Sequence, residues 1–222
     1  SPKETVLGAA LSLSEIAERW QKQAPTVFRE WLELFASPPI RNRATLGGSL
    51  ATASPIGDSA PLLLAFDATL HLASAQGERT VALADFFTAY RRAALAPGEL
   101  IVAIHLPHPL PEHVRFYKIA KRPTDDISSL AACFALDWEE EDTITRARFA
   151  FGGVAPTPVR VTAAEKTVLG LPWDESTMHR AQAVFASTLQ PIDDHRASAA
   201  YRLAMAQSLL EKFLSERSHR RA

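Results

Sequence analysis

Three prolines within five residues, Pro107, Pro109 and Pro111, interrupt the chain close to its midpoint. Proline fixes φ and lacks a backbone N–H, so a run of this density ends regular structure on both sides. Before the run, helical and strand-like segments are mixed, whereas after it three strand-like segments precede three helical ones. We therefore predict an α+β chain of two units, residues 1–110 and residues 111–222.

The first unit carries clear local signals. Ser12 and Glu15 have the spacing of a capping box, and the apolar residues behind them recur at helical spacing. We expect helices at about 13–20, 26–35 and 61–65, strands at 5–11 and 100–106, and a hairpin of 68–73 with 78–83. A domain rarely opens on a core strand without a lead-in, so we also expect residues upstream of this chain.

The second unit alternates strand-like and charged stretches. Segments 114–121, 129–138 and 143–151 suggest a three-stranded antiparallel sheet, and helices are expected at 162–169, 174–189 and 197–217. The last helix has an apolar stripe that suits packing on a sheet, formed by Leu203, Leu210, Phe213 and Leu214.

Composition narrows the function classes. The chain has 24 basic and 25 acidic residues, so it lacks the basic excess typical of phosphate-gripping nucleic-acid binders. Its single cysteine, Cys133, excludes an internal disulfide and lies in an apolar run typical of a core. The seven histidines show no metal-ligand spacing, and His105 and His108, which flank a proline, are expected to be exposed. With no bilayer-length apolar run and no signal peptide, we predict a cytoplasmic protein that binds no metal, membrane or nucleic acid.

The most informative stretch is residues 37–58, a long connection rich in Pro, Gly, Ser and Thr. Long connections in compact domains are usually functional or disordered, and four embedded apolar residues argue against disorder. Gly47 and Gly48 would let the backbone approach a ligand and expose N–H groups, as pyrophosphate binding requires. Asp58 could accept a hydrogen bond from a ribose or ribityl hydroxyl. The pattern is not the dinucleotide fingerprint G-x-G-x-x-G.

Motifs along nearly the whole chain resemble the FAD-binding domain of molybdenum hydroxylases, most closely the small subunit of bacterial xanthine dehydrogenase. The likeness begins with Phe-Ala-Ser-Pro-Pro-Ile-Arg-Asn-Arg-Ala-Thr-Leu-Gly-Gly-Ser at 35–49 and Ser-Pro-Ile-Gly-Asp at 54–58. It continues at 86–91, 97–99, 117–122 and 125–127. It resumes with Phe-Gly-Gly-Val-Ala at 151–155 and Arg-Ala-Ser-Ala-Ala-Tyr-Arg at 196–202.

This resemblance implies the second half of a vanillyl-alcohol-oxidase-like FAD-binding domain, followed by the C-terminal flavoprotein domain of the family. It implies FAD as the cofactor and NAD+ as the electron acceptor. A molybdenum-binding large subunit would oxidise a purine or related heterocycle, and electrons would reach FAD through [2Fe-2S] clusters of an iron–sulphur domain. The chain would then be one part of a hetero-oligomer. The cofactor performs the redox chemistry, so we expect no catalytic acid or base here.

The resemblance also assigns residues. Matches to FAD contacts or to the loop around FAD are Phe35, Thr45, Gly47, Gly48, Ser49, Thr52, Asp58, Ile101 and Lys118, with the glycines and Ser49 near the pyrophosphate. Lys118 would favour the anionic reduced flavin by Coulomb attraction. Tyr90 matches an aromatic residue at which the nicotinamide dinucleotide docks. Asp125 is the second candidate for that site and belongs to a loop, residues 121–127, that is mobile in the family; Asp125 and Asp126 could instead cap a turn.

The sequence departs from the family pattern in places. Ser49 stands where asparagine is usual, and Gly57 where serine is also common. The family's first FAD subdomain, with its glycine-rich pyrophosphate loop, and its iron–sulphur domains have no counterpart in these 222 residues. Two alternatives remain open. The chain could come from a carbon monoxide dehydrogenase or aldehyde oxidoreductase flavoprotein with another acceptor, or it could be a truncated interaction module without flavin.

Overall fold

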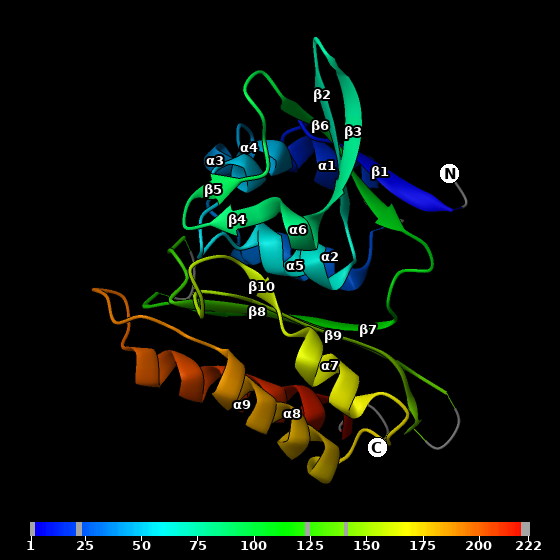
Figure 1. Ribbon diagram of the computed structural model, residues 1–222, viewed down its shortest axis with the longest axis vertical. Helices are drawn as coiled ribbons and strands as arrows, with labels where there is room; N and C mark the ends of the chain where they lie inside the picture. Colours follow the sequence, from blue (N-terminus) through cyan, green and yellow to red (C-terminus); the bar gives the residue numbers. More distant parts are fainter. Residues whose placement is uncertain (1–2, 21–23, 123–124, 140–141, 219–222) are drawn as a thin grey trace.

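A computed structural model describes residues 3–20, 24–122, 125–139 and 142–218 (Figure 1). The predicted loop at 121–127 therefore lies partly outside the described residues, at residues 123 and 124. Among the described helices, none is long and apolar enough to cross a membrane.

The first half is built on a four-stranded antiparallel sheet with the strand order β1-β6-β2-β3. Its strands are β1 (Glu4–Gly8), β2 (Thr69–Ser74), β3 (Gly77–Ala82) and β6 (Leu100–Pro107), which agree with the predicted strands and hairpin. Helices α1 (Leu13–Trp20), α2 (Thr26–Leu34) and α5 (Ser59–Ala65) supply much of the core beside it. The capping box is confirmed, because the Glu15 carboxylate accepts from the Ser12 N–H at 2.8 Å.

The stretch 37–58 is not the irregular connection that we expected. It contains two short helices, α3 (Pro38–Arg41) and α4 (Leu46–Ala51). Both helices are too short for apolar periodicity to reveal them in the sequence, because each spans little more than one turn. Tertiary contacts hold α4 in place, since Leu46 and Leu50 are fully buried in the core.

A small hairpin projects from the first half after the turn α6 (Leu83–Phe86). It is formed by β4 (Phe87–Ala89) and β5 (Arg92–Ala93), which make a separate two-stranded sheet. Tyr90 and Arg91 form its tip, and Arg91 has a φ of 53°, in the left-handed region.

The second half contains a sheet with the order β10-β9-β8-β7. The three predicted strands are present as β7 (His113–Ile119), β8 (Leu130–Trp138) and β9 (Ile144–Gly152), with antiparallel pairing. The prediction of three strands was wrong by one, because the two-residue strand β10 (Val159–Arg160) pairs with the end of β9. The predicted helices are α7 (Thr162–Val168), α8 (Glu175–Thr188) and α9 (Ala199–Ser218).

The second sheet is covered on both faces (Figure 1). Helices α7, α8 and α9 pack on one face, where Phe134, Phe149 and Phe185 belong to one buried cluster. The other face carries Cys133 and Ala150, which join the core of the first half together with α2 and α5. Every residue from Leu130 to Leu136 is therefore buried, and the two halves share a continuous apolar interface.

Candidate functional site

A buried ion pair joins the two halves beside α2. Lys118 on β7 donates to Oδ2 of Asp58 at 2.8 Å and to the Leu34 carbonyl oxygen at 3.0 Å. The lysine side chain is 4% exposed and the aspartate side chain 10%. Two residues that lie 60 positions apart are thus brought together next to Phe35, directly after the end of α2.

Asp58 is used inside the protein. Its Oδ1 accepts from the Ser128 hydroxyl, and its carbonyl oxygen accepts from Nε1 of Trp31 at 3.0 Å. Both carboxylate oxygens of Asp58 thus already have a donor within the protein, and acceptance of a further hydrogen bond from a ribityl hydroxyl stays a prediction. Lys118 uses two of its three N–H groups in these hydrogen bonds, so the third can still donate to a ligand.

The two glycines of α4 allow close packing rather than presenting free N–H groups. A Cβ at Gly47 would lie 2.8 Å from Cβ of Ala9 and 2.9 Å from its carbonyl oxygen. The N–H of Gly47 donates to that carbonyl at 3.1 Å, and the N–H of Gly48 donates to Oγ1 of Thr45, the N-cap of α4, at 3.0 Å. Both N–H groups therefore already donate within the protein, although Gly48 itself is exposed, and the place of these glycines near a pyrophosphate stays a prediction.

Hydroxyl groups around α4 keep part of their bonding capacity. Oγ1 of Thr45 accepts from Gly48, so its proton remains available to a ligand acceptor. Thr52 donates to the Gly48 carbonyl at 2.8 Å and keeps its lone pairs. Ser49 is hydrogen-bonded to the buried Ser59 hydroxyl. The surface of α4 thus offers neutral hydroxyl groups on the segment that leads to Asp58.

Strand β6 supports this region from the sheet. Ile101 is half-buried and packs against the core of the first half. The carbonyl of its neighbour Val102 accepts from the Ala9 N–H at 2.9 Å, and the Ala9 carbonyl in turn accepts from Gly47. Backbone bonds therefore connect the Ile101 segment to α4. The structure thus groups Phe35, Asp58 and Lys118 around α2, and links Ile101 to α4.

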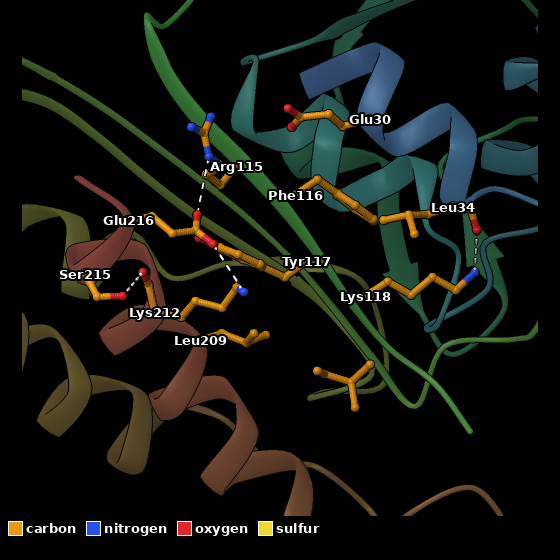
Figure 2. Close-up of a pocket in the computed structure, with 11 residues that line it drawn as sticks. Glu30, Leu34, Arg115, Phe116, Tyr117, Lys118, Leu209, Lys212, Ser215 and Glu216 are labelled. Atoms are coloured by element: carbon orange, nitrogen blue, oxygen red, sulfur yellow. Dashed lines mark hydrogen bonds and ion pairs between the residues drawn. The ribbon is translucent and has the colours of Figure 1, made fainter. Parts of the chain in front are cut away.

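A groove of about 700 Å³ runs along the outer strand β7, between α2 and α9 (Figure 2). Glu216 of α9 is its centre: the carboxylate accepts from the Tyr117 hydroxyl at 2.9 Å and pairs with Arg115 at 3.3 Å and Lys212 at 3.2 Å. Burial, followed by the charge of Glu216, raises the pKa of Tyr117 well above its ordinary range. Sequence reasoning did not find this cluster, because its members come from two distant elements.

A second pocket, of about 520 Å³, lies where the β4–β5 hairpin meets the second half. Tyr90, with an exposed fraction of 59%, stands at this pocket. The loop between α8 and α9 contributes Arg196 to this pocket. The segment between β9 and β10 contributes Gly153. The pocket also contains Ser54, Pro55, Ile56, Arg91, Ala155, Pro156, Ile192, Asp194, His195 and Arg202.

Arg202 organises the floor of this pocket. Its side chain is 2% exposed, donates to the Gly153 carbonyl at 2.9 Å and pairs with Asp194 at 2.7 Å. Asp194 also accepts from two backbone N–H groups, and its pKa is lowered by these bonds and by the nearby guanidinium although burial acts in the opposite direction. In the described chain, Arg91 and Arg196 have no carboxylate partner, so the pocket carries two uncompensated positive charges.

Asp125 does not line this pocket. It lies in the exposed loop that follows β7, with a φ of 49°. Its neighbour Asp126 accepts from the N–H groups of Ile127 and Arg122, so Asp126 caps a turn as the alternative interpretation proposed. Lys121 ties the start of this loop to the His195 carbonyl at 3.0 Å.

Two histidine expectations had different outcomes. His108 is exposed, as predicted. His105 is half-buried in the first sheet instead of exposed, and its Nδ1 lies 3.0 Å from a Glu4 carboxylate oxygen. Cys133 is a buried free thiol, as its apolar setting predicted.

Comparison with known families gives two matches along the chain. Residues 1–109 match the FAD binding domain in molybdopterin dehydrogenase, and residues 115–217 match the CO dehydrogenase flavoprotein C-terminal domain. The putative xanthine dehydrogenase FAD-binding subunit XdhB of Escherichia coli K12 is 33% identical, over 95% of this chain and 73% of that protein. The xanthine dehydrogenase of Blastobotrys adeninivorans is 35% identical over 94% of this chain, which spans only 16% of its length.

Solved structures agree in fold. CO dehydrogenase from Oligotropha carboxidovorans superposes with a TM-score of 0.87 at 28% identity, over 95% of this chain and 73% of that chain. The chain therefore belongs to the FAD-binding family of molybdenum hydroxylases, and it is homologous to xanthine dehydrogenase FAD-binding subunits. The resemblance inferred from the motifs is confirmed at the level of family and fold.

Proposed function

We propose that this chain forms one wall of an FAD site in an oxidoreductase of the xanthine dehydrogenase type. The supporting observation is the grouping of Phe35, Lys118 and Asp58 at the end of α2. The FAD contacts assigned by resemblance are Phe35, Thr45, Gly47, Gly48, Ser49, Thr52, Asp58, Ile101 and Lys118. Their donor set suits the cofactor, because an aromatic ring, neutral hydroxyls and one lysine match a flat ring with polar edges.

The chain's own groups would bind and orient the flavin. Asp58 holds Lys118 in place, and the remaining N–H of Lys118 would donate to a ring oxygen or nitrogen. The hydroxyl of Thr45 would donate its proton to a phosphate or ribityl oxygen, and the hydroxyl oxygen of Thr52 would accept from a ribityl hydroxyl. When bound, FAD would supply the redox chemistry, which this chain positions and tunes.

The electron acceptor that we favour is NAD+. The Tyr90 pocket combines an exposed aromatic ring with the unpaired guanidinium groups of Arg91 and Arg196. Guanidinium groups bind phosphate oxygens in bidentate fashion, and an aromatic face can stack on a nicotinamide or adenine ring. Asp125 would take part only through movement of its loop. The similarity to CO dehydrogenase supports the alternative of another acceptor.

The partners proposed from the family are a molybdenum-binding large subunit and an iron–sulphur domain carrying [2Fe-2S] clusters. Electrons would reach FAD from those clusters, and the substrate, a purine or related heterocycle, would bind on the large subunit. We retain residues 1–110 and 111–222 as the proposed domains.

Titration of the purified protein with FAD tests the first proposal. We expect the fluorescence of free FAD to be quenched on binding, and Lys118→Met to weaken binding at least about tenfold because it removes a charge-assisted hydrogen bond of roughly 1.5–3 kcal/mol. Lys212→Met is the matched control, since Lys212 on α9 lines the same groove as Lys118 but pairs with Glu216. Absence of quenching in the unaltered protein would leave the non-flavin interaction module as the better interpretation.

The same samples test the acceptor. Under anaerobic conditions NADH should bleach the bound flavin, and Tyr90→Ala should raise the NADH concentration needed without releasing FAD. If flavin binds but NADH leaves its spectrum unchanged, the acceptor is of another class. If Tyr90→Ala responds like the unaltered protein, Tyr90 has no part in the acceptor site.

A further inference from the structure

A bidentate ion pair lies beside the segment that leads out of the β4–β5 hairpin. Arg79 on β3 donates from Nε to Oε1 of Glu99 at 2.6 Å and from Nη2 to Oε2 at 2.7 Å. The Glu99 side chain is only 10% exposed. Fork-to-fork geometry between a guanidinium and a carboxylate adds directional specificity to charge attraction. This pair therefore has the geometry of a rigid clamp rather than that of a fluctuating surface contact.

The same two side chains bind the intervening backbone. Oε2 of Glu99 accepts from the Ala96 N–H at 2.7 Å, and Nη2 of Arg79 donates to the Ala94 carbonyl at 2.5 Å. The hydrogen bonds from Arg79, followed by that from Ala96, lower the pKa of Glu99 to about 2. A carboxyl with a lowered pKa keeps its interaction above its ordinary value and loses it only as the pH falls through about 2. The clamp is thus charged throughout the physiological range.

What the clamp holds is the return arm of the hairpin. Residues 94–99 lead from β5 back to β6, and the Ala94 N–H donates to the Phe86 carbonyl at 2.8 Å. Strand pairing gives the hairpin little support, because β5 contains only two residues and its pairing with β4 is irregular, although Phe87 and Ala93 at its ends pack against the core of the first half. Its tip carries Tyr90 and Arg91, both exposed to solvent. Rigidity at the tip must therefore come from the two ends of the hairpin.

We propose that Arg79 and Glu99 are positioning residues that fix the Tyr90–Arg91 tip over the pocket in which the electron acceptor binds. The proposal rests on the proposed function insofar as Tyr90 is the acceptor contact. Neither side chain lines the pocket, so both act through the backbone of residues 94–99. Loss of the clamp leaves the pocket residues of the second half in place but lets Tyr90 and Arg91 move away from them.

Limited proteolysis tests the clamp without any cofactor. The exposed Arg91 and Arg92 are trypsin sites at the hairpin tip, and cleavage of a locally opened segment follows the population of the open form. We expect Glu99→Gln to accelerate cleavage there at least about fivefold, measured by mass spectrometry of that cut, with an unchanged circular dichroism spectrum. Glu78→Gln is the matched control, because Glu78 is an exposed acid on β3 that pairs with His71.

Flavin reduction by NADH then separates positioning from chemistry. Glu99→Gln should raise the NADH concentration at half-maximal reduction several-fold, with the limiting rate and FAD affinity unchanged. For Arg79→Lys, this NADH concentration should lie between the values for the unaltered protein and for Glu99→Gln. Lysine keeps the positive charge but cannot form the bidentate hydrogen bonds of a guanidinium group. Unchanged cleavage at Arg91 and Arg92 in Glu99→Gln would overturn the clamp. Faster cleavage in a protein whose flavin NADH cannot reduce would support the clamp and refute the proposed acceptor.

Discussion

At the scale of single residues, the contacts inside the 37–58 stretch decide what its motif does. Gly47 lies against the Ala9 backbone, and Thr45 caps α4. The paired glycines thus first serve to bring a short helix close to the end of β1. A ligand at α4 would meet hydroxyl groups on its surface, not the N–H groups of those glycines.

Gly47→Ala should therefore destabilise the protein. The added Cβ would lie under 3.0 Å from two Ala9 atoms, one of them in the backbone, so the sheet and α4 must move apart. We expect a loss of about 1–3 kcal/mol in the free energy of unfolding, the usual cost of overpacking, measured by urea denaturation. Gly57→Ala is the control, because its Cβ would meet the Ser54 carbonyl oxygen at an ordinary 3.4 Å. Equal stability of the two variants would contradict this account.

At the scale of elements, the first turn of α1 is joined to the proposed flavin loop. Ser12 forms a bridge with Thr45, and the Leu13 N–H donates to the Ala44 carbonyl at 2.9 Å. The capping box therefore stabilises more than one helix end, because it also fixes the start of α1 against the residue that caps α4.

The capping box should give a pH-dependent contribution to stability. The backbone N–H and the hydroxyl of Ser12, with a smaller contribution from Arg19, lower the pKa of Glu15. A lowered pKa means that this stabilisation is full above the ordinary value of 4.5 and is lost as the pH falls through the lowered pKa. The Tm of Glu15→Gln should be below that of the unaltered protein at pH 7 and converge with it in acid.

Two variants complete this measurement. Ser12→Ala should cost about 1 kcal/mol at neutral pH, the typical effect of removing an N-cap side chain. Glu18→Gln, at an exposed position of the same helix, should follow the unaltered protein at every pH. A constant Tm difference for Glu15→Gln across the pH range would show that its charge has no role in the box.

At the scale of the whole molecule, the second sheet is the shared centre of both halves. An ion-pair network at its edge adds to the apolar interface. Asp67, at the end of α5, accepts from Nε of Arg148 at 2.8 and 2.9 Å and also pairs with Arg160. Arg160 in turn pairs at 2.9 Å with Glu165, whose pKa is raised by burial despite its hydrogen bonds.

Asp67→Asn should weaken the association of the two halves. Asparagine tolerates the left-handed φ of 52° at this position, so the variant removes charge without adding backbone strain. We expect a loss of about 1–3 kcal/mol because two guanidinium groups lose their carboxylate, less than the cost for a fully buried pair. Thermal unfolding measures it, with the exposed Asp85→Asn as control. A Tm for Asp67→Asn equal to that of the control would assign the interface to apolar packing alone.

The sequence by itself determined the family and most regular elements. Helices α1, α8 and α9 and the β2–β3 hairpin follow from apolar spacing, capping residues and turn residues, which act within a few positions of each other. The family could be inferred because several motifs occur in a matching order along the chain. The candidate residues were named for the same reason, although their roles in this chain stay predictions.

Only the tertiary structure decided how those residues are used. It paired Lys118 with Asp58, placed Arg202 beneath the Tyr90 pocket and assembled the Glu216 cluster from β7 and α9. It also formed the short helices α3 and α4, which have too few residues for a periodic signal. Each of these features depends on contacts between segments far apart in the chain. Local spacing carries no information about such contacts, so the sequence could identify the parts of the proposed site but not their partners.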